Sequence, residues 1–522
     1  MTSPCNTDVV PRYLLERNAL EHPDGLMASF EDGTKWTWTD GVTHARSAAS
    51  VLRSMGVEQG SCVGVFLRNG PEFLRAWLGI TFLGAAMVPV NTAFKGSMLE
   101  YAIAITRPEL VVSAGELARR LGAVVTTPIL DVAELTGGAP GDVELARPIE
   151  TWDTHHFMFT SGTTGRSKAA RTSFAQFFQL GSWATVDVGI GEDDVFLIDL
   201  PLSHGSALCM AACSFSTRTP IAVRSVPEMN AYFETARDTG ATVGFLLSSM
   251  VGYLLNKPES PAEHEHRLRV MISAPLPPDP AAFQKRFGIA QIITAYGSSE
   301  VPGILAQNDP STPLVDGSCG RPRKGFEIQL VDEHDMPVPV GETGELVVRA
   351  DQPWLLTTEY AGDPDRTATA WRNGWFHTGD LMRRDAEGNY YIVDRVKDAL
   401  RRRGENISTY EVEQELSRVP GVAEVACVAV ASPAGDDECK VWVVPQPGTT
   451  LDFAAIAREL ADRMPHFMVP RYYELIDDLP KTTTMKVQKF LLRERGNTED
   501  TWDLETHGRI RVTRDGIREM SI

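Results

Sequence analysis

The sequence predicts an α/β protein with a large N-terminal domain of mostly parallel sheets and flanking helices plus a β-rich subdomain, and a small α+β C-terminal domain. The chain has 522 residues, more than one compact hydrophobic core usually organises. Up to Val393, helical and strand patterns alternate, as expected for parallel sheets covered by helices. A densely charged stretch then interrupts the apolar periodicity, and separate helix and strand patterns follow it.

Short apolar runs predict the strands of the large domain. Residues 62–67 lie between Gly60 and Asn69, as expected for a buried parallel strand. Helical spacing at residues 45–55 precedes this strand, and a second helix is expected at residues 73–82. The other expected strands are residues 110–112, 195–198, 242–246, 270–272 and 292–294.

The β-rich subdomain is expected at residues 317–395. The segments GSCGRP, FEIQLVDE and GETGELVVRA read as short strands broken by glycine turns. A linker at residues 394–398 divides the chain into an N-terminal domain, residues 1–396, and a C-terminal domain, residues 397–522. No internal repeat or low-complexity tract interrupts either domain.

A helix and two strands are expected early in the C-terminal domain. Ser408 and Glu411 match the S-x-x-E capping box, which begins a helix. Val412 and Leu416 would lie on one face of that helix. Strands at residues 425–430 and 441–444 and a helix at residues 453–464 complete the expected elements.

Composition excludes several classes of function. The 50 basic and 69 acidic side chains give a formal charge of −19, which argues against nucleic acid or an anionic membrane as the main partner. The seven cysteines form no CxxC pair, so we expect a reduced, cytoplasmic setting without a disulfide framework or zinc site. The start of the chain shows no signal-peptide pattern. Residues 77–90 are too short to span a bilayer and predict a buried helix running into a strand.

The stretch FMFTSGTTGRSK at residues 157–168 is the most informative motif. Its three apolar residues would end a buried strand, and its glycines would let the backbone turn N–H groups toward an anion. Lys168 adds a positive charge. The spacing differs from that of a P-loop, because no lysine follows the second glycine directly. The motif predicts a polyphosphate-binding loop, and the alternative is a surface turn. The hydroxyl and glycine residues concerned are Thr160, Ser161, Gly162, Thr163, Thr164 and Gly165.

A second motif, AYGSSE, occupies residues 295–300 directly after an expected strand. The Tyr296 ring can stack on a purine. Glu300 can bind Mg²⁺, which prefers one or two protein carboxylates together with phosphate oxygens. The alternative is an ordinary strand-to-helix turn.

Two charged residues further along the chain suggest ribose binding, and a third is a lysine near the C-terminus. In GWFHTGD, Asp380 follows an expected tight Thr-Gly turn and could accept both hydroxyls of a ribose. Arg395 could donate to the same sugar, although a single arginine is more often a surface ion pair. Lys486 lies on a threonine-rich loop, LPKTTTMK, where the alternative is a solvated lysine.

Together these stretches resemble the ANL superfamily, which contains acyl-CoA synthetases, adenylation domains of peptide synthetases, and luciferases. The resemblance covers nearly the whole chain. The segments RRRGENIS and VQK, the latter directly after Lys486, are most similar to the crotonobetaine/carnitine–CoA ligase branch. The matching segments are TSGTTGRSK (160–168), LPLSH (200–204), SAPL (273–276), AYGSSE (295–300), GRP (320–322), HTGD (377–380), DRVKD (394–398), RRRGENISTYEVE (401–413) and LPKTTTMK (479–486).

The resemblance implies roles for individual residues. The loop 160–168 would embrace the β- and γ-phosphates, Ser299 would contact the α-phosphate, and Asp380 with Arg395 would bind the ribose. Lys397 would be the hinge of a mobile C-terminal domain, and Gly404 would line the path of the CoA pantetheine arm. The residues expected to line the adenine are Ser273, Ala274, Pro275 and Tyr296, beside Ala295, Gly297 and Ser298. The expected catalytic residues are Lys486, Glu300, His204 and Thr163, and the expected Mg²⁺ ligands are Glu300 and Thr160.

The activity implied is that of an ATP-dependent carboxylic acid–CoA ligase. Such an enzyme uses ATP and Mg²⁺ to convert a carboxylate to acyl-AMP and pyrophosphate, and then transfers the acyl group to CoA. Lys486 would bridge the carboxylate and the α-phosphate. His204 is either a gate between acyl pocket and thiol tunnel or a core histidine. The identity of the acid stays open.

Two other functions are compatible with parts of the sequence. An amide-bond synthetase would pass the acyl group to an amine, with Asp199 deprotonating the incoming ammonium. The alternative for Asp199 is a helix-capping or salt-bridged carboxylate. A nucleotide-binding regulator is disfavoured, because the residues expected for catalysis are retained together. We expect small-molecule partners, no nucleic acid and no integral membrane segment. The oligomeric state stays open, and a homodimer is compatible with the sequence.

Overall fold

The computed structural model divides into two compact units. The first unit comprises Met1–Gly162, Arg166–Ile328 and Val348–His377, and the second is built mainly from Gln329–Val347 and Thr378–Ile522. The residues described by the structure are 6–141, 143–160, 168–179, 188–255, 257–274, 276, 279–307, 314–395, 400–402, 405–407, 409–431, 437–481, 487–513 and 516–519.

The first unit contains two mainly parallel sheets. One has the strand order β6-β5-β3-β4-β7-β8, and the other contains the order β15-β14-β13-β12-β11-β9-β10-β1-β2. The strands of the smaller sheet are β3 (Cys62–Phe66), β4 (Ala86–Pro89), β5 (Leu110–Ser113), β6 (Ile129–Asp131), β7 (Thr154–Thr160) and β8 (Lys168–Ser173). Those of the larger sheet are β1 (Leu26–Phe30), β2 (Lys35–Thr37), β9 (Phe196–Ile198), β10 (Ile221–Val223), β11 (Val243–Leu247), β12 (Val270–Ala274), β13 (Gln291–Tyr296), β14 (Leu305–Gln307) and β15 (Ser318–Pro322).

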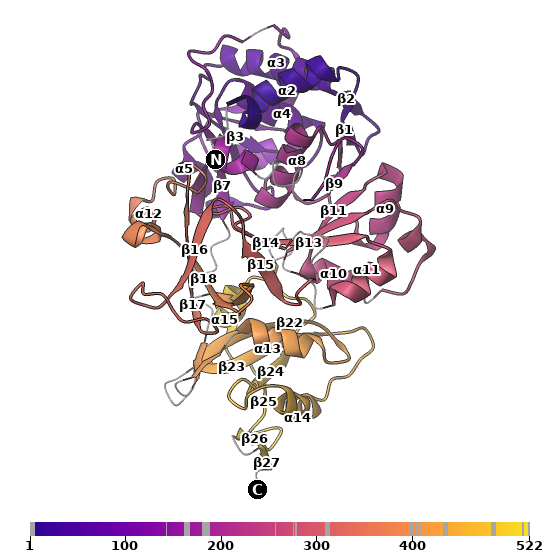
Figure 1. Cartoon of the computed structure of the whole chain (residues 1–522), viewed down its shortest axis with the longest axis vertical. Helices are drawn as coiled ribbons and strands as arrows, with labels where there is room; N and C mark the ends of the chain where they lie inside the picture. The colour runs from indigo at the N-terminus through magenta and orange to yellow at the C-terminus, as the bar shows by residue number, and fades with distance from the viewer. Residues whose placement is uncertain are drawn as a thin grey trace. The chain divides into compact units, whose positions relative to one another are not determined.

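Helices connect and cover these strands (Figure 1). They are α1 (Asn6–Val9), α2 (Pro11–Glu21), α3 (Trp38–Ser54), α4 (Pro71–Phe82), α5 (Gly96–Thr106), α6 (Gly115–Gly122), α8 (Gly205–Thr217), α9 (Tyr232–Thr239), α10 (Ser248–Leu255), α11 (Pro280–Phe287) and α12 (Pro364–Ala370). Short 3₁₀ helices are η1 (Val132–Thr136), η2 (Met229–Ala231), η3 (Pro261–His264) and η4 (Arg372–Gly374).

Apolar side chains of helices and strands together form the core of the first unit. α3 begins at a capping box formed by Thr37 and Asp40, which satisfies backbone groups that the helix leaves unpaired. On α4, Trp77 is fully buried and meets Phe215 of α8 edge to face, with ring centroids 5.5 Å apart. The Asn18 amide of α2 donates to the Phe215 carbonyl oxygen at 2.9 Å. These contacts join α2, α4 and α8 into one layer.

The strands and helices predicted for the large domain are present. The strands expected in the two sheets correspond to β3, β5, β9, β11, β12 and β13, and their mutual pairing within each sheet is parallel. Residues 77–90 run from buried α4 into β4, as predicted. Among the described residues, no helix is long and apolar enough to cross a membrane. The α/β fold class is therefore confirmed.

The β-rich region contains β16 (Phe326–Val331), β17 (Thr343–Ala350), β18 (Phe376–Arg384) and β19 (Tyr390–Arg395). Further along, the second unit has a sheet of order β22-β23-β24-β25, which buries its own apolar cluster against α13 and α14. The elements there are β20 (Leu400–Arg402), β21 (Glu405–Ile407), α13 (Thr409–Ser417), β22 (Val422–Ala431), β23 (Asp437–Pro445), α14 (Phe453–Arg463), β24 (Tyr472–Leu475), α15 (Lys489–Arg495), β25 (Trp502–Asp503), β26 (Ile510–Thr513) and β27 (Gly516–Glu519).

The C-terminal elements match the sequence pattern. Val412 and Leu416 are both buried in the apolar cluster, as expected for one face of α13. The predicted capping residue Ser408 lies outside the described residues. The helix is therefore confirmed, and its capping box stays a prediction. The boundary proposed between residues 396 and 397 stays a prediction.

Candidate active site

The predicted adenine-binding segments lie at one edge of the larger sheet. β9, β11, β12 and β13 are parallel neighbours, so their carboxyl ends meet at the same edge, where ligands bind in open α/β sheets. β12 ends with Ser273 and Ala274, and β13 ends with Ala295 and Tyr296. Ser273 and Tyr296 are buried, whereas the two alanines are half-buried. The sheet therefore brings these two segments side by side.

The glycine after β13 occupies a tight turn. A Cβ atom at Gly297 would lie 2.3 Å from the Gly303 backbone nitrogen and 2.7 Å from the Val301 carbonyl oxygen. Ser298 and Val301 exchange two backbone hydrogen bonds, each of 3.2 Å. The chain then returns as β14, antiparallel to β13. The strand-to-helix alternative is therefore wrong, because strand pairing follows Glu300.

Glu300 is held through its backbone and its side chain. Its carbonyl oxygen accepts from the Thr357 N–H at 2.9 Å and from the Gln176 amide at 3.1 Å. Its carboxylate Oε1 accepts from the Tyr360 hydroxyl at 3.0 Å. The residue is 8% exposed, and within the described residues it forms no ion pair with a lysine or arginine. One carboxylate oxygen is thus held by a neutral donor, which suits the other to a hard cation.

Tyr360 also contacts the lysine of the glycine-rich motif. The Lys168 Nζ lies 4.5 Å from the centroid of the Tyr360 ring, within the range of a cation–π interaction. Lys168 begins β8 and pairs with Thr160, the last residue of β7. The segment around Tyr360 runs antiparallel to β8, since Ala361 donates to Ala169 at 2.8 Å. Tyr360 therefore joins the base of the predicted phosphate loop to Glu300.

His204 occupies the start of α8. It is the N-cap residue, and its Nδ1 accepts from the Ser206 N–H at 3.4 Å and lies 3.0 Å from the Ser206 hydroxyl. A Cβ atom at the next residue, Gly205, would lie 3.9 Å from the Ser299 hydroxyl oxygen. His204 is half-buried at a helix end rather than inside the apolar core. Its gating role stays a prediction.

Asp199 follows β9 and is 3% exposed. Burial raises its pKa to about 7, although the backbone N–H groups of Asp199 and Leu200 partly oppose that rise. In the part of the chain that the structure describes, no ion pair reaches this carboxyl, and the N-cap of α8 is His204. Among the residues that the structure describes, neither a salt bridge nor a helix cap accounts for Asp199.

In the second unit, Asp380 and Arg395 are directly opposite one another. They are Cα partners in the antiparallel pairing of β18 with β19. Asp380 is buried, and its N–H donates to the Thr378 hydroxyl at 3.1 Å. The prediction of a tight turn before Asp380 is wrong, because the chain stays in a strand there. Residues 376–384 are one strand, which Gly379 distorts with a φ of +74°.

Several predicted residues lie outside the described part of the chain, and Arg395 is described by its backbone alone. Those outside are Ser161, Gly162, Thr163, Thr164, Gly165, Pro275, Lys397, Gly404 and Lys486. Sequence reasoning missed Gln176 and Tyr360. Tyr360 lies 60 residues beyond Glu300, and no local motif links the two.

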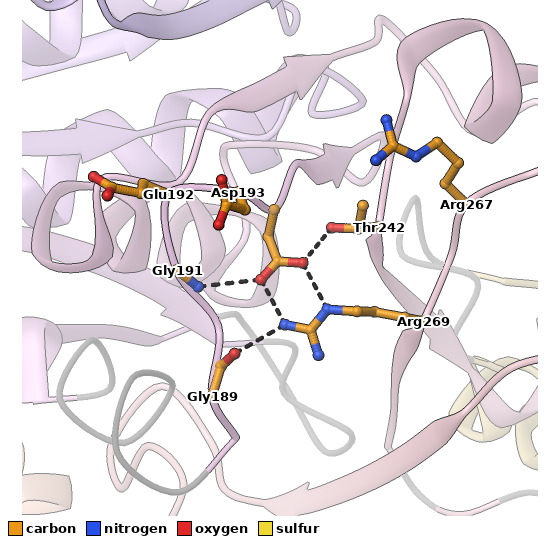
Figure 2. Close-up of a pocket in the computed structure, with 8 residues that line it drawn as sticks. Gly189, Gly191, Glu192, Asp193, Thr242, Arg267 and Arg269 are labelled. Atoms are coloured by element: carbon orange, nitrogen blue, oxygen red, sulfur yellow. Dashed lines mark hydrogen bonds and ion pairs between the residues drawn. The ribbon is translucent and has the colours of Figure 1, made fainter.

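A cavity of about 400 Å³ lies at the opposite edge of the larger sheet. Its lining residues precede β9, β11 and β12, so it is at their amino ends (Figure 2). Asp194 there accepts from Arg269 Nε at 2.8 Å, the Thr242 hydroxyl at 2.7 Å and the Gly191 N–H at 3.1 Å. Burial raises the pKa of this carboxyl, but the hydrogen bonds and charge of Arg269 hold it below its usual value. The arrangement is a structural ion pair.

Comparison with known families decides the classification. The family described as AMP-binding enzyme matches residues 15–358, and the AMP-binding enzyme C-terminal domain matches residues 411–486. The chain belongs to the AMP-binding enzyme family. It is therefore an enzyme of the adenylate-forming type that the motifs indicated.

Individual relatives cover most of this AMP-binding enzyme. It is 30% identical to the crotonobetaine/carnitine–CoA ligase of Citrobacter koseri over 84% of this chain and 90% of that protein. The ATP-bound structure of MatB from Rhodopseudomonas palustris is similar, with 25% identity, a TM-score of 0.85, and coverage of 94% and 99%. The o-succinylbenzoate CoA synthetase of Bacillus subtilis shares the fold, with 22% identity, a TM-score of 0.84, and coverage of 96% and 100%. The predicted branch is thus among its relatives.

Proposed function

We propose that the protein is an ATP-dependent carboxylic acid–CoA ligase. Family membership supports this, as does the 30% identity to a crotonobetaine/carnitine–CoA ligase. The observation that carries the proposal is the contact chain from Lys168 through Tyr360 to Glu300. It joins a cation at the base of the predicted phosphate loop to a carboxylate suited to a metal. A substrate made of a polyphosphate and a metal ion needs both groups, the cation for its phosphates and the carboxylate for its metal.

The first half-reaction would activate the acid. A carboxylate oxygen attacks the α-phosphorus of ATP, the bond from that phosphorus to the bridging oxygen breaks, and pyrophosphate leaves. The product is a mixed anhydride, acyl-AMP. In the second half-reaction the CoA sulfur attacks the acyl carbon, the thiol proton is lost, and AMP departs. The first step brings negative groups together, so positioned positive charge lowers its barrier.

The residues present fit a bound Mg²⁺. Glu300 is nearly buried, is not neutralised by a described basic side chain, and has one oxygen oriented by Tyr360. Oxygen ligands of this kind are those that Mg²⁺ prefers. Glu300, with Thr160 at the end of β7, would hold the ion. When bound, Mg²⁺ would offset phosphate charge and stabilise the departing pyrophosphate.

The other residues would bind and orient the substrates. Lys168 and the loop 161–167 would hold the β- and γ-phosphates, and Tyr296 would stack on the adenine. In the second unit, the Asp380–Arg395 pair offers a carboxylate and a guanidinium at paired strand positions, as ribose binding requires. Lys486 would bridge the carboxylate and the α-phosphate.

The thioester half would need a second arrangement. We place the hinge at Lys397, so that the domain beyond residue 396 withdraws Lys486 and presents Gly404 to the thiol. His204 begins α8, next to Gly205, whose Cβ position lies 3.9 Å from the Ser299 hydroxyl oxygen, and it would guard the junction of acyl pocket and thiol path. Crotonobetaine and carnitine are the first acids to test, followed by aromatic, branched-chain and fatty acids.

The decisive experiment measures pyrophosphate release from ATP and Mg²⁺ across that panel. CoA or a set of amines is then added in separate arms, and mass spectrometry identifies the product. We expect acid-dependent pyrophosphate release and an acyl-CoA product. An amide product would favour an amide-bond synthetase. No acyl-AMP from any acid would refute the proposal.

A further inference from the structure

We infer that Tyr360 is a positioning residue that fixes the Glu300 carboxylate for Mg²⁺ and keeps it apart from Lys168. This inference rests on the proposed function. Tyr360 belongs to none of the motifs that identify the family here, and the contact connects two segments far apart in the chain. It would act through Glu300, without touching the reacting atoms.

The position of the Tyr360 ring is set by its backbone. The Tyr360 N–H donates to the Thr367 hydroxyl at 3.0 Å, and the Tyr360 carbonyl oxygen accepts from the Asp363 N–H at 3.1 Å. A β-bridge pairs Tyr360 with Ala170 of β8. The residue is 6% exposed. Both backbone polar groups of Tyr360 are thus hydrogen-bonded, and its side chain is buried. The ring therefore has little freedom to reorient.

The hydrogen bond has one possible direction. An ionised carboxylate only accepts hydrogen bonds, so the Tyr360 hydroxyl must donate to Glu300. The 3.0 Å distance between the Tyr360 hydroxyl and Oε1 is that of such a hydrogen bond. Holding Oε1 fixes the plane of the carboxylate and leaves Oε2 for the cation. Partners of this kind orient metal ligands in many proteins.

The same side chain contacts two opposite charges. Lys168 lies over the ring face, and Glu300 contacts the hydroxyl at the ring edge. Glu300 forms no ion pair with any described residue, Lys168 included. A direct Lys168–Glu300 pair would cancel the positive charge meant for phosphate and the negative charge meant for the metal. Tyr360 supplies a cation–π contact to the lysine and a hydrogen bond to the glutamate instead.

The test compares Tyr360→Phe with the wild-type protein. Phenylalanine keeps the ring, and thus the Lys168 contact, but removes the hydroxyl. The matched control is Tyr391→Phe, which removes another tyrosine hydroxyl that donates to a carboxylate, that of Asp385 at 2.8 Å. Mn²⁺ affinity is measured by electron paramagnetic resonance in the presence of a non-hydrolysable ATP analogue. Analogue affinity without metal and thermal unfolding are measured in parallel.

We expect Tyr360→Phe to weaken Mn²⁺ binding about tenfold, the lower end of the effect of removing such a partner. Analogue affinity without metal should stay within about twofold of wild type, as should Mn²⁺ affinity in Tyr391→Phe. Unchanged Mn²⁺ affinity in Tyr360→Phe, or an equal loss in the control, would overturn the inference.

A double-mutant cycle with Glu300→Gln keeps the test decisive if Tyr360→Phe unfolds more easily than the wild-type protein. If Tyr360 acts through Glu300, adding Tyr360→Phe to Glu300→Gln should weaken Mn²⁺ binding no further. Additive losses would show an independent effect and refute the positioning role. Failure of the proposed function looks different: the wild-type protein would then release no pyrophosphate with any acid, whatever the metal affinities of the variants.

Discussion

Two adjacent histidines predict that the first unit loses stability in mild acid. His155 and His156 lie on β7, which leads into the glycine-rich motif, and both are buried. The Trp77 indole N–H donates to His155 Nε2 at 2.8 Å, and the two histidine Nδ1 atoms are 2.7 Å apart. Since an indole N–H only donates, His155 carries its proton on Nδ1 and donates it to His156. Both rings are therefore neutral.

The direction of the pH effect follows from burial. Burial lowers the pKa of His156 to about 3, and burial together with the neighbouring His156 lowers that of His155 well below its usual value. In the unfolded chain both titrate at about pH 6.5. As the pH falls below that value, the unfolded state takes up protons that the native state does not. The contribution of the two histidines to the free energy of unfolding therefore falls with pH, over a window from about 6.5 to about 3 for His156.

The magnitude follows from the pKa difference. For each proton that only the unfolded state binds, the free energy of unfolding falls by about 1.4 kcal/mol per pH unit. At pH 5, about 1.5 units below the unfolded pKa, each histidine costs about 2 kcal/mol, and the pair about 4 kcal/mol. Total stabilities of native domains are about 5–15 kcal/mol, so this is a large fraction.

The assay is urea unfolding between pH 7 and pH 5, followed by tryptophan fluorescence. We compare the wild-type protein with His156→Gln, whose side-chain oxygen can still accept from His155. Between pH 7 and pH 5, the free energy of unfolding of the variant should fall by about 2 kcal/mol less than that of the wild type, because one titrating group has gone. The exposed His264→Gln is the control and should keep the full dependence. Equal pH dependence in the wild type and His156→Gln would refute the reasoning.

The remaining predictions concern one catalytic and two structural residues. Lys486→Ala should raise the activation free energy of pyrophosphate release by about 3 kcal/mol or more. Thioester formation from supplied acyl-AMP should stay largely intact, and equal loss of both half-reactions would contradict the role of Lys486. Gly297→Ala should abolish acyl-AMP formation, because its Cβ would meet backbone atoms within 3 Å, whereas Gly252→Ala, on α10 with open space around it, should not. Asp194→Asn should lower the urea unfolding free energy by about 2 kcal/mol, since Arg269 loses a bidentate carboxylate. Glu192→Gln, at an exposed pair, should lower it by less than about 1 kcal/mol, and equal effects would count against the structural role of Asp194.

The sequence by itself determined the periodic elements and the family. Alternating helical and apolar patterns predicted β3, α4 and β13 with nearly correct bounds, because side-chain period and burial are local properties of the chain. The motif AYGSSE predicted a glycine-dependent turn after β13 and a carboxylate at its end. These inferences need no information about distant residues.

Only the tertiary structure decided which groups meet. Tyr360 reaches Glu300 because its segment pairs with β8, and His155 is neutral because Trp77 of α4 packs against it. The burial of Asp199 without a described ion pair was equally invisible, as was the strand that replaces the expected turn at Gly379. Such features arise from packing between segments far apart in the chain, and a side chain's charge, orientation and pKa depend on those neighbours rather than on its local sequence.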